Sequence, residues 1–377
     1  MRFRSGLLAT FVAGAIQMLA SSGSGVVHEW GTFTSVAGQD GAAISWETLS
    51  GGSDLPCFVH FLDQRNLKAA AYGLVRMETP VLYFYPLKPM SVSVHIDFPN
   101  GRVTEWYPQA SREQPSSSQN GWIEWNNVQL GGGSESLPNA GGASHYYTAR
   151  ATNAWPLESA GEREKLLFYR GIGDFGIDLK ALVNEDEVSV RNDGAEPIPA
   201  AILFENHAGQ LRYQIIRGLR DAVEFDLSAL GGTMETLRSE FEDELTEMGL
   251  YRDEAHAMVE TWRNSWFEEG LRIFYILPRS AVDALLPISI LPAPEQLTRV
   301  FVGRVELLSP AMKEEIGAAL TSGDVAVLRK YGRFLNAFLR EMSVGSSEPP
   351  MSEQSRQFLQ NAYSQTAAES WKRSCVK

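Results

Sequence analysis

The fold class of this chain is clearest in SVSVHIDFPNGRVTEWY, residues 91–107. Apolar and polar side chains alternate through its first part, which is the two-residue period of a strand with one buried face. The apolar positions are Val92, Val94, Ile96 and Phe98. Asn100-Gly101 follows, and this dipeptide tolerates the positive φ angles of a tight turn. The stretch therefore predicts a β-hairpin with residues 103–107 as its second strand.

Short alternating runs with frequent aromatic and turn residues continue on both sides of this stretch, from residue 26 to residue 230. A second hairpin is expected where residues 187–191 lead through Asn192-Asp193-Gly194 into residues 198–204. Further strands are expected at residues 27–33, 81–85, 122–128, 146–150 and 165–170. This pattern predicts a mainly β fold, with an antiparallel, sandwich-like domain over residues 26–230.

The pattern changes to helical spacing after residue 231. Apolar residues recur every three or four positions from Met234 to Met248, and Thr233 is the expected N-cap. Another helix is expected from Asp253 to Gly270, followed by strands and further helices. We therefore expect a mixed α/β, mostly helical domain over residues 231–344 and a polar tail over residues 345–377.

The first residues have the three-part order of a secretory signal peptide. Arg2 and Arg4 precede an apolar run from Leu7 to Ala20, and small residues follow. This run is shorter than the roughly 20 residues that cross a bilayer core, and no later segment has the length and apolarity to do so. We expect a signal peptide over residues 1–25, no membrane span after cleavage, and a periplasmic or secreted location. An uncleaved membrane anchor is the alternative.

The charge of the chain is strongly negative. Loss of Arg2 and Arg4 with the leader changes the formal net charge from −13 to −15. Such a chain repels phosphate backbones, so nucleic acid is not an expected partner. The glycines at 171, 173 and 176 match GxGxxG, but the crossover helix that a dinucleotide fold requires is missing. Nucleotide is therefore not an expected ligand.

Several histidine and acidic residues suggest a metal site, although no complete metal-binding motif is present. The candidates are His28, Glu29, His60, His95, Asp97 and His145. If these side chains met in space, they would suit a divalent metal of the zinc or calcium kind and a metal-assisted hydrolase. The alternative is that each makes ordinary hydrogen bonds in a sheet or at the surface.

Two other pairs of residues carry expectations of their own. Trp122 and Trp125 are flanked by amide and acidic residues, and exposed indoles in such surroundings suit stacking on sugar rings, whereas buried ones fill a core. Cys57 and Cys375 are the two cysteines of the chain, and an oxidising compartment permits a disulfide between them.

The chain resembles a group of uncharacterised exported bacterial proteins. The resemblance is carried by HEWGTFTS (28–35), DLPCFVH (54–60), METPVLYFY (77–85), FYRGIGDF (168–175) and WFEEGLRIFYILPR (266–279). It implies export and a two-part architecture, and it brings no catalytic residue with it.

Two functions remain open on the sequence. The favoured one is a non-catalytic envelope or extracellular protein that binds a ligand, a glycan or a partner protein through its loops. The other is the metal-assisted hydrolase built on the six metal-ligand candidates. The sequence leaves open whether the protein is an enzyme, and it does not indicate a substrate.

Overall fold

The structure, a computed structural model, describes residues 25–50, 54–62, 72–113, 120–131, 136–141, 144–344 and 350–362, together with Cys375. The protein is mostly β, with 43% strand and 28% helix, and most of its helices lie toward the C-terminus. The expected leader lies outside the described residues, apart from Gly25, as do residues 363–374 of the expected tail. No helix of the described part is long and apolar enough to cross a membrane.

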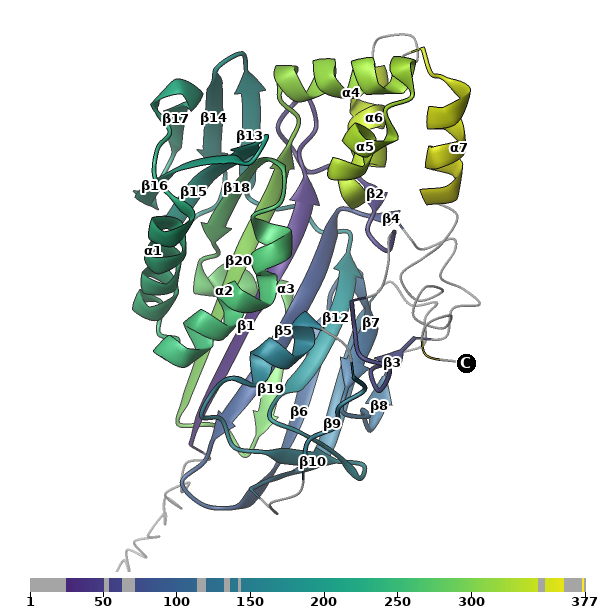
Figure 1. Cartoon of the computed structure of the whole chain (residues 1–377). Coiled ribbons are helices and arrows are strands. Elements are labelled where there is room, and N and C mark those ends of the chain that lie inside the picture. Colours follow the sequence, from purple (N-terminus) through teal and green to yellow (C-terminus); the bar gives the residue numbers. More distant parts are fainter. Residues whose placement is uncertain are drawn as a thin grey trace, which may run out of the picture.

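A nine-stranded mixed sheet forms the centre of the molecule (Figure 1). Its strands, in order across the sheet, are β16 (Gln210–Leu219), β15 (Ile198–His207), β18 (Gly270–Ile276), β20 (Gln296–Leu307), β1 (Val26–Val36), β5 (Val75–Tyr85), β12 (Leu167–Gly173), β7 (Gly101–Tyr107) and β3 (His60–Phe61). Neighbours are antiparallel except β1 and β20, which are parallel, with Val26 opposite Gln296. The first and the last long strands therefore lie side by side.

This strand order corrects the expected division of the chain. β18 and β20 come after residue 231 in sequence, yet they lie between β15 and β1 in the sheet. The expected boundary between residues 230 and 231 therefore runs through one sheet. The expectation of antiparallel pairing is wrong for β1 and β20. The sequence pattern of a strand describes its two faces and does not say which distant strand occupies each of its edges.

Smaller sheets complete the β structure of the described residues. The strands of a six-stranded sheet are β11 (Glu162–Glu164), β10 (Leu157–Ser159), β9 (Gly121–Leu130), β6 (Met90–Phe98) and β19 (Ile288–Leu291), with β8 (Arg112–Glu113) paired to β9. The remaining strands are β13 (Leu179–Asn184), β14 (Glu187–Asn192) and β17 (Ala222–Asp226) in one sheet, and β2 (Trp46–Glu47) and β4 (Tyr72–Gly73) in another.

At both predicted hairpins the chain passes from one sheet to another, so the two flanking strands do not pair with each other. The alternation in residues 92–98 is confirmed, and Asn100 has a φ of 53° at the turn. However, β6 pairs with β9 and β19, whereas β7 pairs with β12 and β3. In the same way β14 and β15, on either side of Asn192-Asp193-Gly194, belong to different sheets. The turn residues allow the chain to reverse, but here the edges of each strand are filled by other partners.

Helices cover the sheet and its upper end (Figure 1). They are α1 (Met234–Glu247), α2 (Arg252–Trp266), α3 (Arg279–Leu285), α4 (Pro310–Ser322), α5 (Val325–Lys330), α6 (Leu335–Ser343) and α7 (Glu353–Ala362), with 3-10 turns η3 (His145–Arg150), η4 (Leu227–Ala229) and η5 (Gly332–Phe334). The Thr233 cap is confirmed, because its side chain accepts a hydrogen bond from the Thr236 backbone. The strand expected at residues 146–150 is wrong. That segment is η3, whose N-terminus is capped by Ser144.

The nine-stranded sheet is covered on both faces. Consecutive residues of one strand enter different apolar cores: Phe274 packs with Phe241 and Trp266 of the helices α1 and α2, while Ile273 belongs to the core on the other face. That second core also contains Trp125 of β9, so the six-stranded sheet shares it. A strand buried on both faces has to be apolar almost throughout, and any charged residue in it needs a partner.

Candidate functional site

The six metal-ligand candidates do not meet. His28, on β1, is 1% exposed, and its Nδ1 lies 2.6 Å from Glu254 Oε2 at the start of α2. Tyr85 donates to the other oxygen of Glu254 at 2.7 Å, and burial raises the pKa of Tyr85, which keeps the phenol a donor. This closed group joins β1 and β5 to α2. We conclude that His28 is a buried structural contact.

Glu29 points to the opposite face of β1. Its carboxylate accepts from the Tyr169 hydroxyl and is paired with Arg299, and the side chain is wholly buried. Arg299 also donates to Asp283 at 2.9 Å. His28 and Glu29 therefore serve two different networks on two faces of the sheet, as the alternation of a strand requires.

The remaining candidates lie apart from these networks. His60 contacts Glu162 at 2.9 Å, and His145 lies 3.3 Å from Asn264. His95 lies 3.2 Å from Asp97, on the same strand face as expected, and 3.6 Å from Glu124. Among the described residues no group of three or more His, Cys, Asp or Glu side chains could hold a metal ion. The six candidates do not form one cluster, because they belong to different elements and, for His28 and Glu29, to opposite faces of one strand; His95 and Asp97 are the pair that meets.

The two tryptophans differ in their surroundings. Trp125 is fully buried, and its Nε1 donates to the Pro108 carbonyl at 2.9 Å, so it fills the core and is not available to a sugar. Trp122 is half-buried, stacks on His95 with ring centroids 5.6 Å apart, and lies beneath the Arg112 guanidinium. The Trp122 ring is therefore in contact with two side chains of this protein, His95 and Arg112. The structure joins the two cysteines, Cys57 and Cys375, in a disulfide across 318 residues of sequence.

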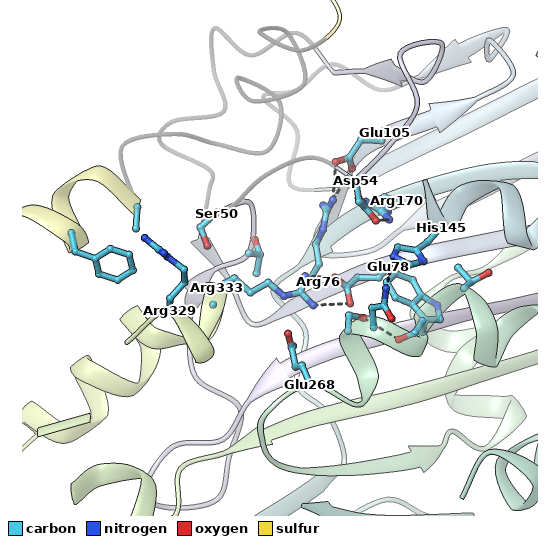
Figure 2. A pocket seen from close by; sticks show the side chains of 18 residues that line it. Ser50, Asp54, Arg76, Glu78, Glu105, His145, Arg170, Glu268, Arg329 and Arg333 are labelled. Carbon is cyan, nitrogen blue, oxygen red and sulfur yellow. Dashed lines mark hydrogen bonds and ion pairs between the residues drawn. The ribbon is translucent and has the colours of Figure 1, made fainter. Parts of the chain in front are cut away.

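A cavity lies elsewhere, on the helical side of the nine-stranded sheet. It has a volume of about 580 Å³ and is lined by residues of β5, β7 and β12, by the end of α2, and by α5, η5 and α7 (Figure 2). Its charged side chains are Asp54, Arg76, Glu78, Glu105, Arg170, Glu268, Arg329 and Arg333. We call it the charged cavity.

Three arginine–carboxylate pairs form the sheet side of the charged cavity. Arg76 Nη2 lies 2.8 and 2.9 Å from the two oxygens of Glu105, and both side chains are buried. Arg170 donates to Asp54 through two nitrogens, at 2.9 and 3.1 Å. The two-nitrogen contact holds Arg170 in one orientation, and Arg76 is held by Glu105 at Nη2 together with the Thr104 hydroxyl, 2.8 Å from Nη1.

The third pair joins the sheet to the helices. Arg333, from η5, donates through both terminal nitrogens to Glu78 on β5. Glu78 also accepts from the Thr34 hydroxyl at 2.6 Å. Burial raises the pKa of Glu78, but Arg333 and Thr34 lower it by more, and the pKa is about 2. This carboxylate is therefore ionised at neutral pH.

The same physical balance holds for Asp54. Desolvation raises its pKa, the nearby Arg170 guanidinium lowers it by more, and the value is about 2. Glu268 at the opposite wall is paired with Arg304 of β20, at 2.7 Å. Arg304 is wholly buried and also holds Glu306 at 2.6 Å. Each carboxylate of the cavity wall is thus committed to an arginine.

The pairs belong to a row of charges across one face of the sheet. Strand register places Arg272 opposite Glu306, Arg304 opposite Thr34, Thr34 opposite Arg76, and Arg170 opposite Glu105. We call the row formed by Arg272, Glu306, Arg304, Arg76, Glu78, Arg170 and Glu105 the charged belt. Apolar residues elsewhere on the same face belong to the core that packs against α1 and α2.

Sequence reasoning missed the charged belt, although a signal was present. The belt residues interrupt otherwise apolar strands, as Arg304 and Glu306 do in VFVGRVEL, residues 300–307. A charge inside such a run is costly unless it is paired, so charges of opposite sign in several buried strands suggest mutual pairing. Of the candidates named from sequence, His145 alone lines the charged cavity.

Comparison with known proteins adds little. No family model and no curated protein matches the chain. The chain is similar to the yeast delta-COP-I mu-homology domain, with 7% identity and a TM-score of 0.28, over 75% of this chain and 97% of that one. The same yeast domain complexed with a Dsl1 WxWxV peptide gives 8% identity and a TM-score of 0.26, with the same coverage. Similarities this low carry no argument about function.

Proposed function

We propose that this chain is an exported, non-catalytic binding protein, built on two face-to-face sheets, and that the charged cavity takes a small polar ligand. The observation that carries the proposal is the set of arginines held in fixed orientation on the cavity wall, Arg76, Arg170 and Arg333, each by two hydrogen bonds to a carboxylate. Donors held in place before a ligand arrives lower the entropy cost of binding.

The charge state of the wall favours binding over acid–base catalysis. A general acid or base is most effective with a pKa near the working pH. The pKa values of Asp54 and Glu78 are about 2, because Arg170 and Arg333 hold the ionised forms. Both carboxylates are occupied by their partners, so neither is poised to exchange a proton with a substrate. The metal-assisted hydrolase has no support in this geometry, since its six residues are dispersed.

Export and location rest on the sequence and on the disulfide. The leader has the order of a signal peptide, and disulfides persist in oxidising compartments outside the cytoplasm. The Cys57–Cys375 bond is consistent with such a compartment. We therefore place the mature protein in the periplasm or outside the cell. A glycan or an envelope protein remains within the proposed class of partners, and the acidic charge disfavours nucleic acid.

The proposal is tested by blocking the cavity. Ser265 of α2 lines it, and Ser265→Tyr places a large side chain in the space. Ser322→Tyr is a matched control, because Ser322 is an exposed helical serine and its hydroxyl also contacts the carbonyl three residues earlier.

Native mass spectrometry of the mature protein, incubated with a mixture of small polar metabolites, supplies the readout. We expect a retained small molecule in the wild type and in Ser322→Tyr, and its loss in Ser265→Tyr. Retention of the same molecule by all three proteins, or by none, would show that the charged cavity is not a binding site.

A further inference from the structure

We infer that the ligand of the charged cavity is an anion with carboxylate or phosphate oxygens, and that Arg329 meets its charge. This inference rests on the proposed function and adds the chemical class of the ligand. It is argued from the pairing of charges around the cavity, from polar atoms of wall residues that lack a hydrogen-bond partner in the described part of the chain, and from the position of Arg329.

The charges around the cavity leave one arginine without a carboxylate. The arginines that line the cavity are Arg76, Arg170, Arg329 and Arg333, and the carboxylates that line it are Asp54, Glu78, Glu105 and Glu268. All four carboxylates are paired with arginines, three of them within the lining and Glu268 with Arg304 outside it. No carboxylate among the described residues forms an ion pair with Arg329. The eight charges of the lining balance, yet Arg329 is the arginine among them whose charge no ion pair of the described part offsets.

Hydrogen-bond donors are also left over on the wall. A guanidinium carries five N–H donors, and Arg333 uses two nitrogens on Glu78. Trp262 and Thr261 of α2 line the cavity and are 5% and 4% exposed, yet the indole Nε1 and the Thr261 hydroxyl have no hydrogen-bond partner among the described residues. Indole N–H is a donor only. Both atoms are buried within residues of the wall, so acceptor oxygens of a ligand would pair with them only by direct contact with this end of α2.

Arg329 stands at the end of the cavity that is farthest from His145, with Arg333 between them (Figure 2). It lies in the last turn of α5, and its guanidinium is 5.6 Å from the ring centroid of Phe358 on α7. An arginine stacked on an aromatic ring keeps its planar edge free for two-point contact with a carboxylate or a phosphate. We therefore assign the anionic group of the ligand to this end.

The inference is tested with three probes that share one ring and differ in charge: glucuronate, glucose and glucosamine. Inorganic phosphate serves as the second anion, and sodium chloride equalises the ionic strength. Binding to the mature, disulfide-bonded protein is followed by NMR titration. We expect glucuronate or phosphate to bind the wild type more tightly than glucose, and glucosamine to bind most weakly. The comparison between glucuronate and phosphate identifies which acid group the site prefers.

Variants of two arginines give the residue-level test. Arg329→Gln is expected to weaken anion binding by roughly tenfold, the usual effect of losing a charged hydrogen bond, and Arg329→Lys to retain part of it. Arg220→Gln, which removes an exposed arginine that does not line the cavity, is expected to bind as the wild type does.

Failure of the inference differs from failure of the proposed function. If glucose or glucosamine binds at least as tightly as the anions, and Ser265→Tyr abolishes that binding, the cavity is a binding site and the anion assignment is overturned. The assignment is also overturned if the protein retains a metabolite but Arg329→Gln changes the affinity for neither glucuronate nor phosphate. The proposed function itself fails when no molecule is retained through the cavity at all.

Discussion

One face of the nine-stranded sheet carries two regions of opposite character. Beneath α1 and α2 its side chains are apolar, as with Phe274, which packs against Phe241 and Trp266. Farther along the same strands, the face carries the charged belt and borders the charged cavity. Both regions are buried, so burial by itself does not separate them. Apolar burial stabilises the fold directly, whereas replacing a buried ion pair with apolar side chains is often neutral, so such pairs contribute little net stability. We infer that the first region maintains the fold, and the second borders the proposed ligand site.

The largest expected effect on stability lies in the apolar region. Phe274→Ala removes a ring that is surrounded by other aromatic rings, and we expect it to lower the free energy of unfolding by roughly 4 kcal/mol. Urea denaturation measures this change. Ligand affinity of the folded variant is expected to remain that of the wild type. A loss of ligand affinity without a loss of stability would reverse the roles of the two regions.

The next effect separates the stability of the belt from its function. Glu105→Leu leaves Arg76 buried without its carboxylate and is expected to cost roughly 3 kcal/mol. The double variant Arg76→Met with Glu105→Leu removes both charges, and we expect its stability to return to within about 1 kcal/mol of the wild type.

The same double variant is expected to lose ligand affinity, because an arginine of the cavity wall is gone. Denaturation and the binding assay of the cavity are measured on the same samples. A double variant that binds ligand normally would show that the Arg76–Glu105 pair has no part in recognition.

The two regions are also expected to differ in how their contribution to stability changes with pH. The folded-state pKa of Glu78 is about 2, below its ordinary value of 4.5. The unfolded chain therefore takes up a proton first, so the stability from this group is complete above pH 4.5 and is lost as the pH falls toward 2. Between pH 5 and pH 3 we expect a loss of about 2 kcal/mol from Glu78. Denaturation curves of the wild type and Glu78→Gln at both pH values measure it. Equal pH dependence in the two proteins would contradict the assignment.

The smallest effect concerns charges at the surface. Arg252 and Asp243 form a pair at 3.0 Å between α2 and α1, and both side chains are more than half exposed. Arg252→Gln is expected to change stability by less than about 0.5 kcal/mol, because water screens the pair. Denaturation in low and high salt measures this value. A loss comparable to that of Glu105→Leu would remove the distinction between buried and exposed charges.

Local features were read well from the sequence. The alternation in residues 92–98 and the Thr233 cap are confirmed, since each depends on residues close together in the chain. The two hairpins were wrong for the opposite reason. A turn such as Asn100-Gly101 specifies that the chain reverses, but not that the flanking strands pair with each other.

The candidate site shows the same division. The sequence indicated that histidines and acids are present, but their partners lie far away along the chain: Glu254 for His28, and Glu162 for His60. No spacing rule connects residues more than one hundred positions apart. Buried charges such as Arg304 were visible as interruptions of apolar strands, yet the cavity they border is assembled from segments between residues 48 and 362.

The sequence by itself determined the strand and helix character of most segments, the acidic charge and the expectation of export. These properties follow from side-chain periodicity, turn chemistry and composition, which act over a few residues. Tertiary structure alone decided that β1 pairs with β20 and that the charged residues of several strands meet in one row. The physical reason is that strand edges and buried charges must each find a partner, and that partner is selected by the packing of the whole chain.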